Sequence, residues 1–138
     1  TREGFLAGFG NEGGVNCKSY FLKNIAGLWI IQQCRKKWMK ENKRNLPWGK
    51  LIELTGNSID RNIFIDVDDP SFEKEIFDMP TAIIRYCKKT NQKIPETIGE
   101  FSRNIFESLA LKYALNIKSL EKIIEGKIEL LHLVGGGS

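Results

Sequence analysis

Apolar residues recur every three or four positions in the C-terminal half of the chain, which predicts one long amphipathic helix. Thr97 and Glu100, three residues apart, form a capping box at its start, and Gly126 ends it. Between these residues lies a single apolar stripe about seven turns long. Its members are Phe101, Ile105, Leu109, Tyr113, Ile117, Leu120 and Ile124.

A similar spacing of apolar residues predicts a helix from Asn24 to Met39, with Asn24 as its N-cap. On such a helix Asn24 and Gln32 share one ridge and lie about 12 Å apart along the axis. That distance is comparable with an extended triphosphate, and an amide side chain can bind a phosphate or a hydroxyl. Capping by Asn24 and simple solvent exposure of Gln32 remain alternatives.

Further helix signals lie between these two helices. An aspartate followed closely by proline starts a helix at Asp69 and another at Asp78, the second running to about Thr90. Residues 48–57 predict a short helix that ends at a glycine and an asparagine, and residues 62–67 predict a brief extended segment.

The end of the chain combines an apolar run with glycines. Residues 127–134, "KIELLHLV", predict a strand covered on both faces, because they contain too few polar residues for a wet face. Gly135, Gly136 and Gly137 follow, and their bare backbone amides can approach a phosphate or nucleotide closely. A tight turn or a flexible linker is the alternative. Together with the long helix, this strand predicts an α/β unit.

The N-terminal region gives weaker signals. Residues 1–14 are glycine-rich and expected to be irregular, and residues 15–23 predict a short strand. Gly8–Gly13 spell G-x-G-x-x-G, but no strand precedes them and no helix follows, so a flexible loop is favoured over a dinucleotide site. "DVDDP", Asp66–Pro70, lacks the glycine and distal glutamate of a calcium loop, and helix capping explains its acids better.

The composition of the 138 residues, 41% hydrophobic and 28% charged, is typical of one folded domain and excludes a disordered or fibrous chain. No apolar run is long enough to span a bilayer, and the first residues lack the pattern of a secretory signal. We therefore expect a cytoplasmic protein with no membrane partner. The net charge of +4 lies largely in residues 35–44, where a solvated helix end is favoured over a nucleic-acid surface.

The cysteines and the single histidine predict no catalytic or metal site. Cys17, Cys34 and Cys87 are odd in number and widely spaced, so we expect reduced thiols rather than a disulfide framework or a zinc site. His132 lies inside the apolar run and is expected to be a core residue rather than the partner of a catalytic cysteine.

Two long segments resemble one protein family. Residues 11–38 contain "NEGG", "FLKNI", "GLW" and a closing tryptophan. Residues 77–123 contain "DMP", "PETIGE" and "ESLALKY", and "VDDPSF" and "HLVGGGS" fit the same pattern. In order and spacing these motifs resemble the FGGY carbohydrate kinases, and within them the rhamnulokinase branch.

The resemblance implies a helix-rich portion of an actin-like, ribonuclease H-like ATPase domain. It identifies residues 1–138 with part of the C-terminal domain of a two-domain sugar kinase, whose N-terminal domain and chain end are absent. The catalytic aspartate and the first phosphate loop would lie in the absent part, so no catalytic or metal-binding residue is expected here. The isolated chain would be inactive, and the apolar surface left without partner strands would favour self-association.

Individual roles follow from the same resemblance. Asn24 matches a sugar-contacting position, Gln32 an ATP-contacting position, and Gly136 the nucleotide-binding glycine of a loop that includes Gly135 and Gly137. Some relatives join the "YC" helix to the long helix by a disulfide. Here the counterpart of Cys87 is Asn104, so Cys87 should be free.

The implied activity is phosphorylation of a ketose by ATP with Mg²⁺, with L-rhamnulose as the expected substrate and L-rhamnulose 1-phosphate as the product. A kinase for another sugar, such as L-fuculose or xylulose, is the alternative within this class. A non-catalytic helical interaction module that uses the basic residues 35–44 is the alternative outside it.

Overall fold

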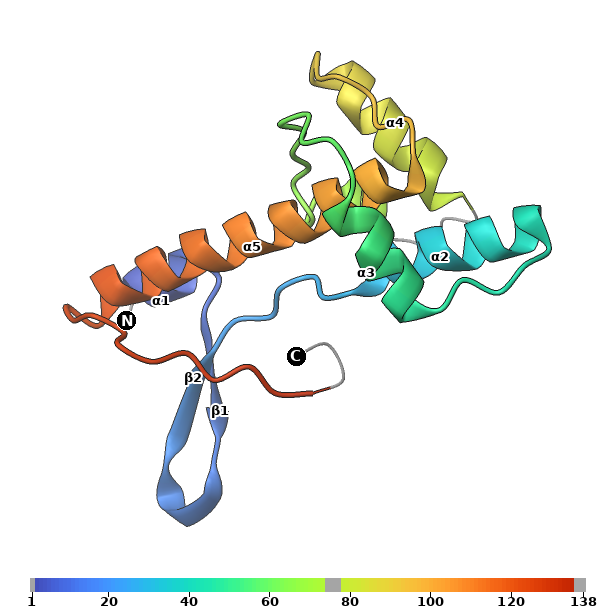
Figure 1. Cartoon of the computed structure of the whole chain (residues 1–138). Coiled ribbons are helices and arrows are strands. Elements are labelled where there is room, and N and C mark those ends of the chain that lie inside the picture. Colours follow the sequence, from blue (N-terminus) through green and yellow to red (C-terminus); the bar gives the residue numbers. More distant parts are fainter. Residues whose placement is uncertain (1, 74–77, 136–138) are drawn as a thin grey trace. The chain divides into compact units, whose positions relative to one another are not determined.

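The computed structural model describes residues 2–73 and 78–135, which divide into two units. The first unit is formed by Thr1–Ile25 with Tyr113–Ser138, and the second by Ala26–Lys112. The longest helix, α5 (Ile98–Ile123), contributes residues to both units (Figure 1). It has the length that the apolar stripe predicts, so this prediction is confirmed.

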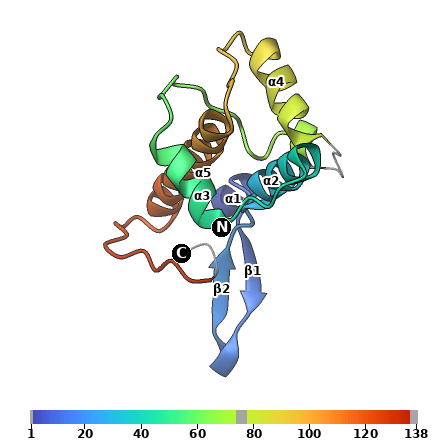
Figure 2. The same ribbon diagram turned by 45° about the vertical axis from the view of Figure 1, so that its right-hand side comes forward.

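The first unit contains a short helix and a β-hairpin. Helix α1 (Arg2–Leu6) precedes strand β1 (Gly10–Gly13), which pairs antiparallel with β2 (Ser19–Leu22). A 3₁₀ turn, η1 (Val15–Cys17), connects the two strands, which lie side by side in both views (Figures 1 and 2). The strand expected within residues 15–23 is confirmed.

The glycine-rich start of the chain is more ordered than the sequence suggests. The expectation of an irregular segment over residues 1–14 is wrong, because α1 and β1 lie there. The flexible loop expected over Gly8–Gly13 is wrong for the same reason. The backbone of β1 pairs with β2, and Phe9 stacks on Phe21 with ring centroids 5.0 Å apart. The glycines therefore form a strand next to a stacked aromatic pair.

The apolar run at residues 127–134 forms no strand, so the prediction of a buried strand is wrong. Leu130 is 69% exposed and Val134 89% exposed. In the described ranges the sheet consists only of β1 and β2, so no strand pairs with this run, although the Ile128 N–H donates to Glu121 Oε1 (3.0 Å). Association of the isolated chain through this exposed apolar surface stays a prediction.

The second unit packs helices around a hydrophobic core. Helices α2 and α4 lie against each other (Figure 2), and the largest fully buried side chains include Phe72, Leu51 and Ile83. The elements of this unit are α2 (Trp29–Asn42), α3 (Trp48–Gly56), η2 (Pro70–Phe72), α4 (Met79–Lys89) and the first part of α5.

The helix starts predicted at Asp69, Asp78 and Thr97 are confirmed. The Asp69 carboxylate accepts the Ser71 N–H (2.8 Å) at the start of η2. The Asp78 carboxylate accepts the Thr81 N–H (3.1 Å) at the start of α4. At α5 the Glu100 N–H donates to Thr97 Oγ1 (3.2 Å), while the Glu100 carboxylate accepts the N–H of Glu96 (2.7 Å), the residue before the cap. The short helix predicted at residues 48–57 is also confirmed, as α3.

The segment at residues 62–67 is extended, as predicted, and its side chains alternate between core and solvent. Ile63, Ile65 and Val67 are buried in the core, whereas Phe64 and Asp66 are exposed. Although no strand pairs with this segment in the described residues, side chains from the helices form hydrogen bonds with its backbone groups. For example, Ser108 Oγ accepts the Ile65 N–H (2.9 Å).

Candidate functional site

Gln32 and Asn24 do not share a helix. Helix α2 begins at Trp29 rather than at Asn24, and its N-cap is Leu28. Gln32 lies in the first turn of α2, where its N–H donates to the Leu28 carbonyl (2.9 Å). Asn24 lies in the irregular segment after β2, and both side chains are exposed. The predicted common ridge, with its spacing of about 12 Å along one helix axis, is therefore wrong.

Gly135 has a backbone conformation that favours glycine. Its φ is 107°, in the region that residues with a Cβ rarely adopt. An added Cβ would meet no heavy atom of the described residues within 4 Å, so the requirement comes from the backbone rather than from crowding. Gly136 and Gly137, the other residues of the predicted loop, lie outside the described residues.

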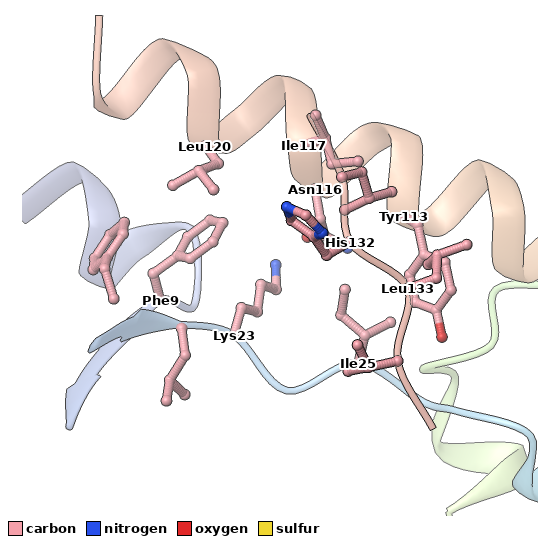
Figure 3. Close-up of a pocket in the computed structure, with 13 residues that line it drawn as sticks. Phe9, Lys23, Ile25, Tyr113, Asn116, Ile117, Leu120, His132 and Leu133 are labelled. Carbon is pink, nitrogen blue, oxygen red and sulfur yellow. The ribbon is translucent and has the colours of Figure 1, made fainter. Parts of the chain in front are cut away.

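The first unit has a pocket of about 410 Å³ next to two of the predicted site residues (Figure 3). Lys23 and Ile25, which flank Asn24 in the chain, line this pocket, and so does Val134, which precedes Gly135. Most of its other walls are apolar and come from the hairpin, from the last turns of α5 and from residues 131–134. Sequence patterns did not predict this pocket, because its walls are distant in the chain.

The polar side chains of Lys23, Asn116 and His132 line the same pocket, as does Tyr113 with its hydroxyl group (Figure 3). The Lys23 ammonium donates to the Ala7 carbonyl (2.7 Å) and lies 5.4 Å from the centre of the Phe9 ring. Lys23 therefore fastens the hairpin to the segment after α1. His132 is exposed on the pocket wall, so the expectation of a buried core histidine is wrong.

Some of the basic residues at 35–44 take part in packing within the second unit. The Arg35 guanidinium lies over the Trp48 ring, 4.9 Å from its centre. Lys37 pairs with Glu41 (3.1 Å) and with Asp78 (3.0 Å). Hydrogen bonds to Asp78 and then Glu41 raise the pKa of Lys37. Arg35 therefore holds α2 against Trp48 at the start of α3, and Lys37 holds it against Asp78, the N-cap of α4.

The three cysteines are free thiols, as predicted. Cys34 and Cys87 are fully buried, whereas Cys17 is exposed. Burial raises the pKa of both buried thiols, and the charge of Asp78 raises that of Cys34 further. Asn104 is buried on α5. The family resemblance gives it as the counterpart of Cys87, at the position where some relatives carry the second cysteine.

The acidic segment Asp66–Asp69 has two roles, of which the sequence predicted one. Asp69 caps η2, and its hydrogen bonds from the Ser71 side chain and backbone lower its pKa. Asp66 and Asp68 instead bind the Lys112 ammonium, at 2.8 and 2.9 Å. This contact joins residues more than forty positions apart in the sequence, so no local pattern could indicate it.

Two kinds of site are not found in residues 2–73 and 78–135. No three His, Cys, Asp or Glu side chains of these ranges are grouped so that they could hold a metal ion. Nor does any described helix have the length and apolar character needed to cross a membrane.

Comparison with known proteins identifies the class. Residues 1–138 match the C-terminal domain of the FGGY family of carbohydrate kinases. The chain therefore belongs to this family, and its helix-rich structure with a small sheet is part of an FGGY C-terminal domain.

Its similar relatives are rhamnulokinases. The rhamnulokinase of Halalkalibacterium halodurans is 40% identical over 129 residues, which cover 94% of this chain and 26% of the relative. Those of Bacteroides thetaiotaomicron and Enterococcus faecalis are 38% and 37% identical over 100% of this chain and 27% of each relative. The chain thus spans about a quarter of the length of the curated relatives that it matches.

Proposed function

We propose that this chain is a segment of a longer carbohydrate kinase, and that the intact protein transfers the γ-phosphoryl group of ATP to the primary hydroxyl of a ketose, L-rhamnulose. The observation that carries this proposal is the 37–40% identity to three rhamnulokinases over 94–100% of the chain. The match includes the segments around Asn24, Gln32 and Gly135.

The intact domain is proposed to have the actin-like, ribonuclease H-like architecture. The exposed apolar run at residues 127–134 supports this proposal, because such a run needs flanking strands to bury it. In the intact domain those strands would come from the remainder of the protein, and the run would become the strand that its sequence predicts. The cytoplasm is the proposed site of the reaction.

The chain supplies binding groups rather than a catalytic base. The exposed Gln32 amide is proposed to hydrogen-bond ATP, and Gly135, with Gly136 and Gly137, to bring bare backbone against the nucleotide. Asn24 is proposed to orient the sugar. Mg²⁺ would neutralise charge on the phosphates when bound, and its protein ligands are proposed to come from the remainder of the protein.

Steady-state kinetics of the intact protein would test this function. We expect kcat/KM to be highest for L-rhamnulose when it is compared with L-fuculose and xylulose. Gln32→Ala should raise KM for ATP about five-fold, the effect of one lost hydrogen bond. Asn24→Ala should raise KM for the ketose instead. Lys88→Ala, an exposed change in the last turn of α4, is the matched control.

Three results would overturn the proposal, wholly or in part, in different ways. Absence of ATP turnover with every ketose would reject a sugar kinase. Preference for another ketose would keep the class and reject L-rhamnulose as the substrate. Polynucleotide binding that weakens steeply with salt, in the absence of turnover, would instead favour an interaction module that uses residues 35–44.

A further inference from the structure

Helix α2, which carries Gln32, begins without a side-chain cap of its own. Its N-cap residue is Leu28, which makes no side-chain cap hydrogen bond, and its first turn contains no acidic residue. The amide groups at the start of a helix have no partner within the helix, so something else must fix this end. The nearby backbone is fixed by Asp68, because the Ala26 N–H donates to Asp68 Oδ1 (3.1 Å).

Asp68 is itself held on its other side. Its Oδ2 lies 2.9 Å from Lys112 Nζ on α5, and its N–H donates to Asp66 Oδ1 (3.2 Å). Asp66 Oδ1 also lies 2.8 Å from Lys112 Nζ. The hydrogen bonds that Lys112 donates to Asp66 and then Asp68 raise the pKa of Lys112, so the lysine stays charged at neutral pH. Ala26, Asp66, Asp68 and Lys112 all belong to the second unit.

This network fixes the backbone just before α2. The Ala26 amide is bonded to a carboxylate from a distant loop, and residues 26–28 lead from it into the first turn at Trp29. The negative charge of Asp68 near this end is also favourable for the helix dipole. Gln32 bonds back to Leu28, so the position of its side chain depends on where this turn begins.

We propose that Asp68 is a positioning residue: by holding the Ala26 amide it sets the first turn of α2 and so places Gln32 for its contact with ATP. The inference rests on the proposed function, since it needs Gln32 to touch the nucleotide. The alternative is a purely structural ion pair between Asp68 and Lys112. These side chains are 35% and 22% exposed, and such a pair contributes little to stability.

The test uses three variants of the intact kinase. Asp68→Ala should raise KM for ATP about five-fold, as expected if the misplaced Gln32 loses its one hydrogen bond to ATP. It should leave kcat within about two-fold. Asp68→Asn keeps an oxygen that can accept the Ala26 N–H, so it should restore most of the affinity. Asp66→Asn weakens the contact with Lys112 but leaves the bond to Ala26, so its KM for ATP should be close to the wild-type value.

Amide hydrogen exchange supplies a readout that is independent of activity. Exchange at Ala26 should become faster in Asp68→Ala and stay slow in Asp66→Asn. A lower melting temperature in Asp68→Ala with unchanged KM and unchanged exchange at Ala26 would overturn the proposal in favour of a structural ion pair.

Gln32→Ala separates failure of this inference from failure of the proposed function. If Gln32→Ala raises KM for ATP and Asp68→Ala does not, positioning by Asp68 is rejected while the nucleotide contact stands. If neither variant changes KM in an active kinase, the assignment of Gln32 is rejected, and the positioning role with it. An intact protein without kinase activity would reject the proposed function itself.

Discussion

The backbone of Gly99 on α5 lies directly against the carbonyl of Leu54 on α3. A Cβ added to Gly99 would lie 2.3 Å from the Leu54 oxygen and 2.9 Å from its carbonyl carbon. Both are main-chain atoms, which a rotamer change cannot move aside. The two helices can approach this closely only because residue 99 has no side chain.

Gly99→Ala should therefore destabilise the second unit. Alanine normally favours a helix over glycine by about 1 kcal/mol, but forced separation of two packed helices costs about 1–3 kcal/mol. We expect a net loss in the free energy of unfolding, measured with urea. Gly49→Ala on α3 is the matched control, because its Cβ would meet no heavy atom of the described residues within 4 Å, and this change should stabilise the protein. Equal effects of the two substitutions would contradict the packing argument.

Gln92 should stabilise the extended segment at residues 62–67. Its Oε1 accepts the Phe64 N–H (2.8 Å) and its Nε2 donates to the Phe64 carbonyl (2.7 Å), so the amide side chain replaces a neighbouring strand. Gln92→Ala removes both bonds and should cost about 1–2 kcal/mol in the free energy of unfolding. Amide exchange at Phe64 should also become faster.

The neighbouring exposed residue provides the comparison for Gln92. Lys93→Ala alters a side chain next in sequence and should leave both quantities unchanged. Protection of the Phe64 amide that persists in Gln92→Ala would show that other groups hold this segment.

Glu100 should make stability depend on pH in the acid range. Glu100 is 5% exposed. Burial acts to raise its pKa, but the Glu96 N–H and the Arg61 guanidinium, which lies 2.9 Å from its Oε1, lower the pKa below the ordinary value of 4.5. The folded state then binds this proton less readily than the unfolded chain. The stabilisation is complete above pH 4.5 and is lost as the pH falls below that value.

Glu100→Gln isolates this contribution. The variant keeps an oxygen for the Glu96 amide but cannot ionise, so its free energy of unfolding should fall less steeply below pH 4.5 than that of the wild type. Urea unfolding at a series of pH values measures both slopes. Identical slopes would show that Glu100 titrates alike in the folded and unfolded chains.

Helix starts in this chain could be predicted wherever the cap is local. The aspartates at 69 and 78 and the threonine at 97 bond to amides two or three residues away, so the sequence contains the whole interaction. The start of α2 could not be predicted in this way. A carboxylate 42 positions away takes the Ala26 amide just before this helix, and the residues around Asn24 contain no sign of that contact.

The same distinction between local and distant contacts applies to the strands. Apolar content in residues 127–134 predicts burial, but a strand also needs a neighbour, and the described residues pair none with it. The glycine-rich β1 carries almost no strand signal in its own residues, because its partner β2 determines it. Of the predicted site, Gln32 and Asn24 are exposed as ligand contacts require, whereas the pocket beside Asn24 depends on segments far apart in the sequence.

Because two of the three thiols in this chain are buried, a single thiol is open to chemical labelling. Only Cys17 is exposed, in the turn between β1 and β2, while Cys34 and Cys87 are enclosed and resist ionisation. Among the three thiols of this chain, a maleimide dye would react at Cys17 without any engineered change. Fluorescence from the hairpin tip would then report changes around this residue, including any that the proposed nucleotide binding causes.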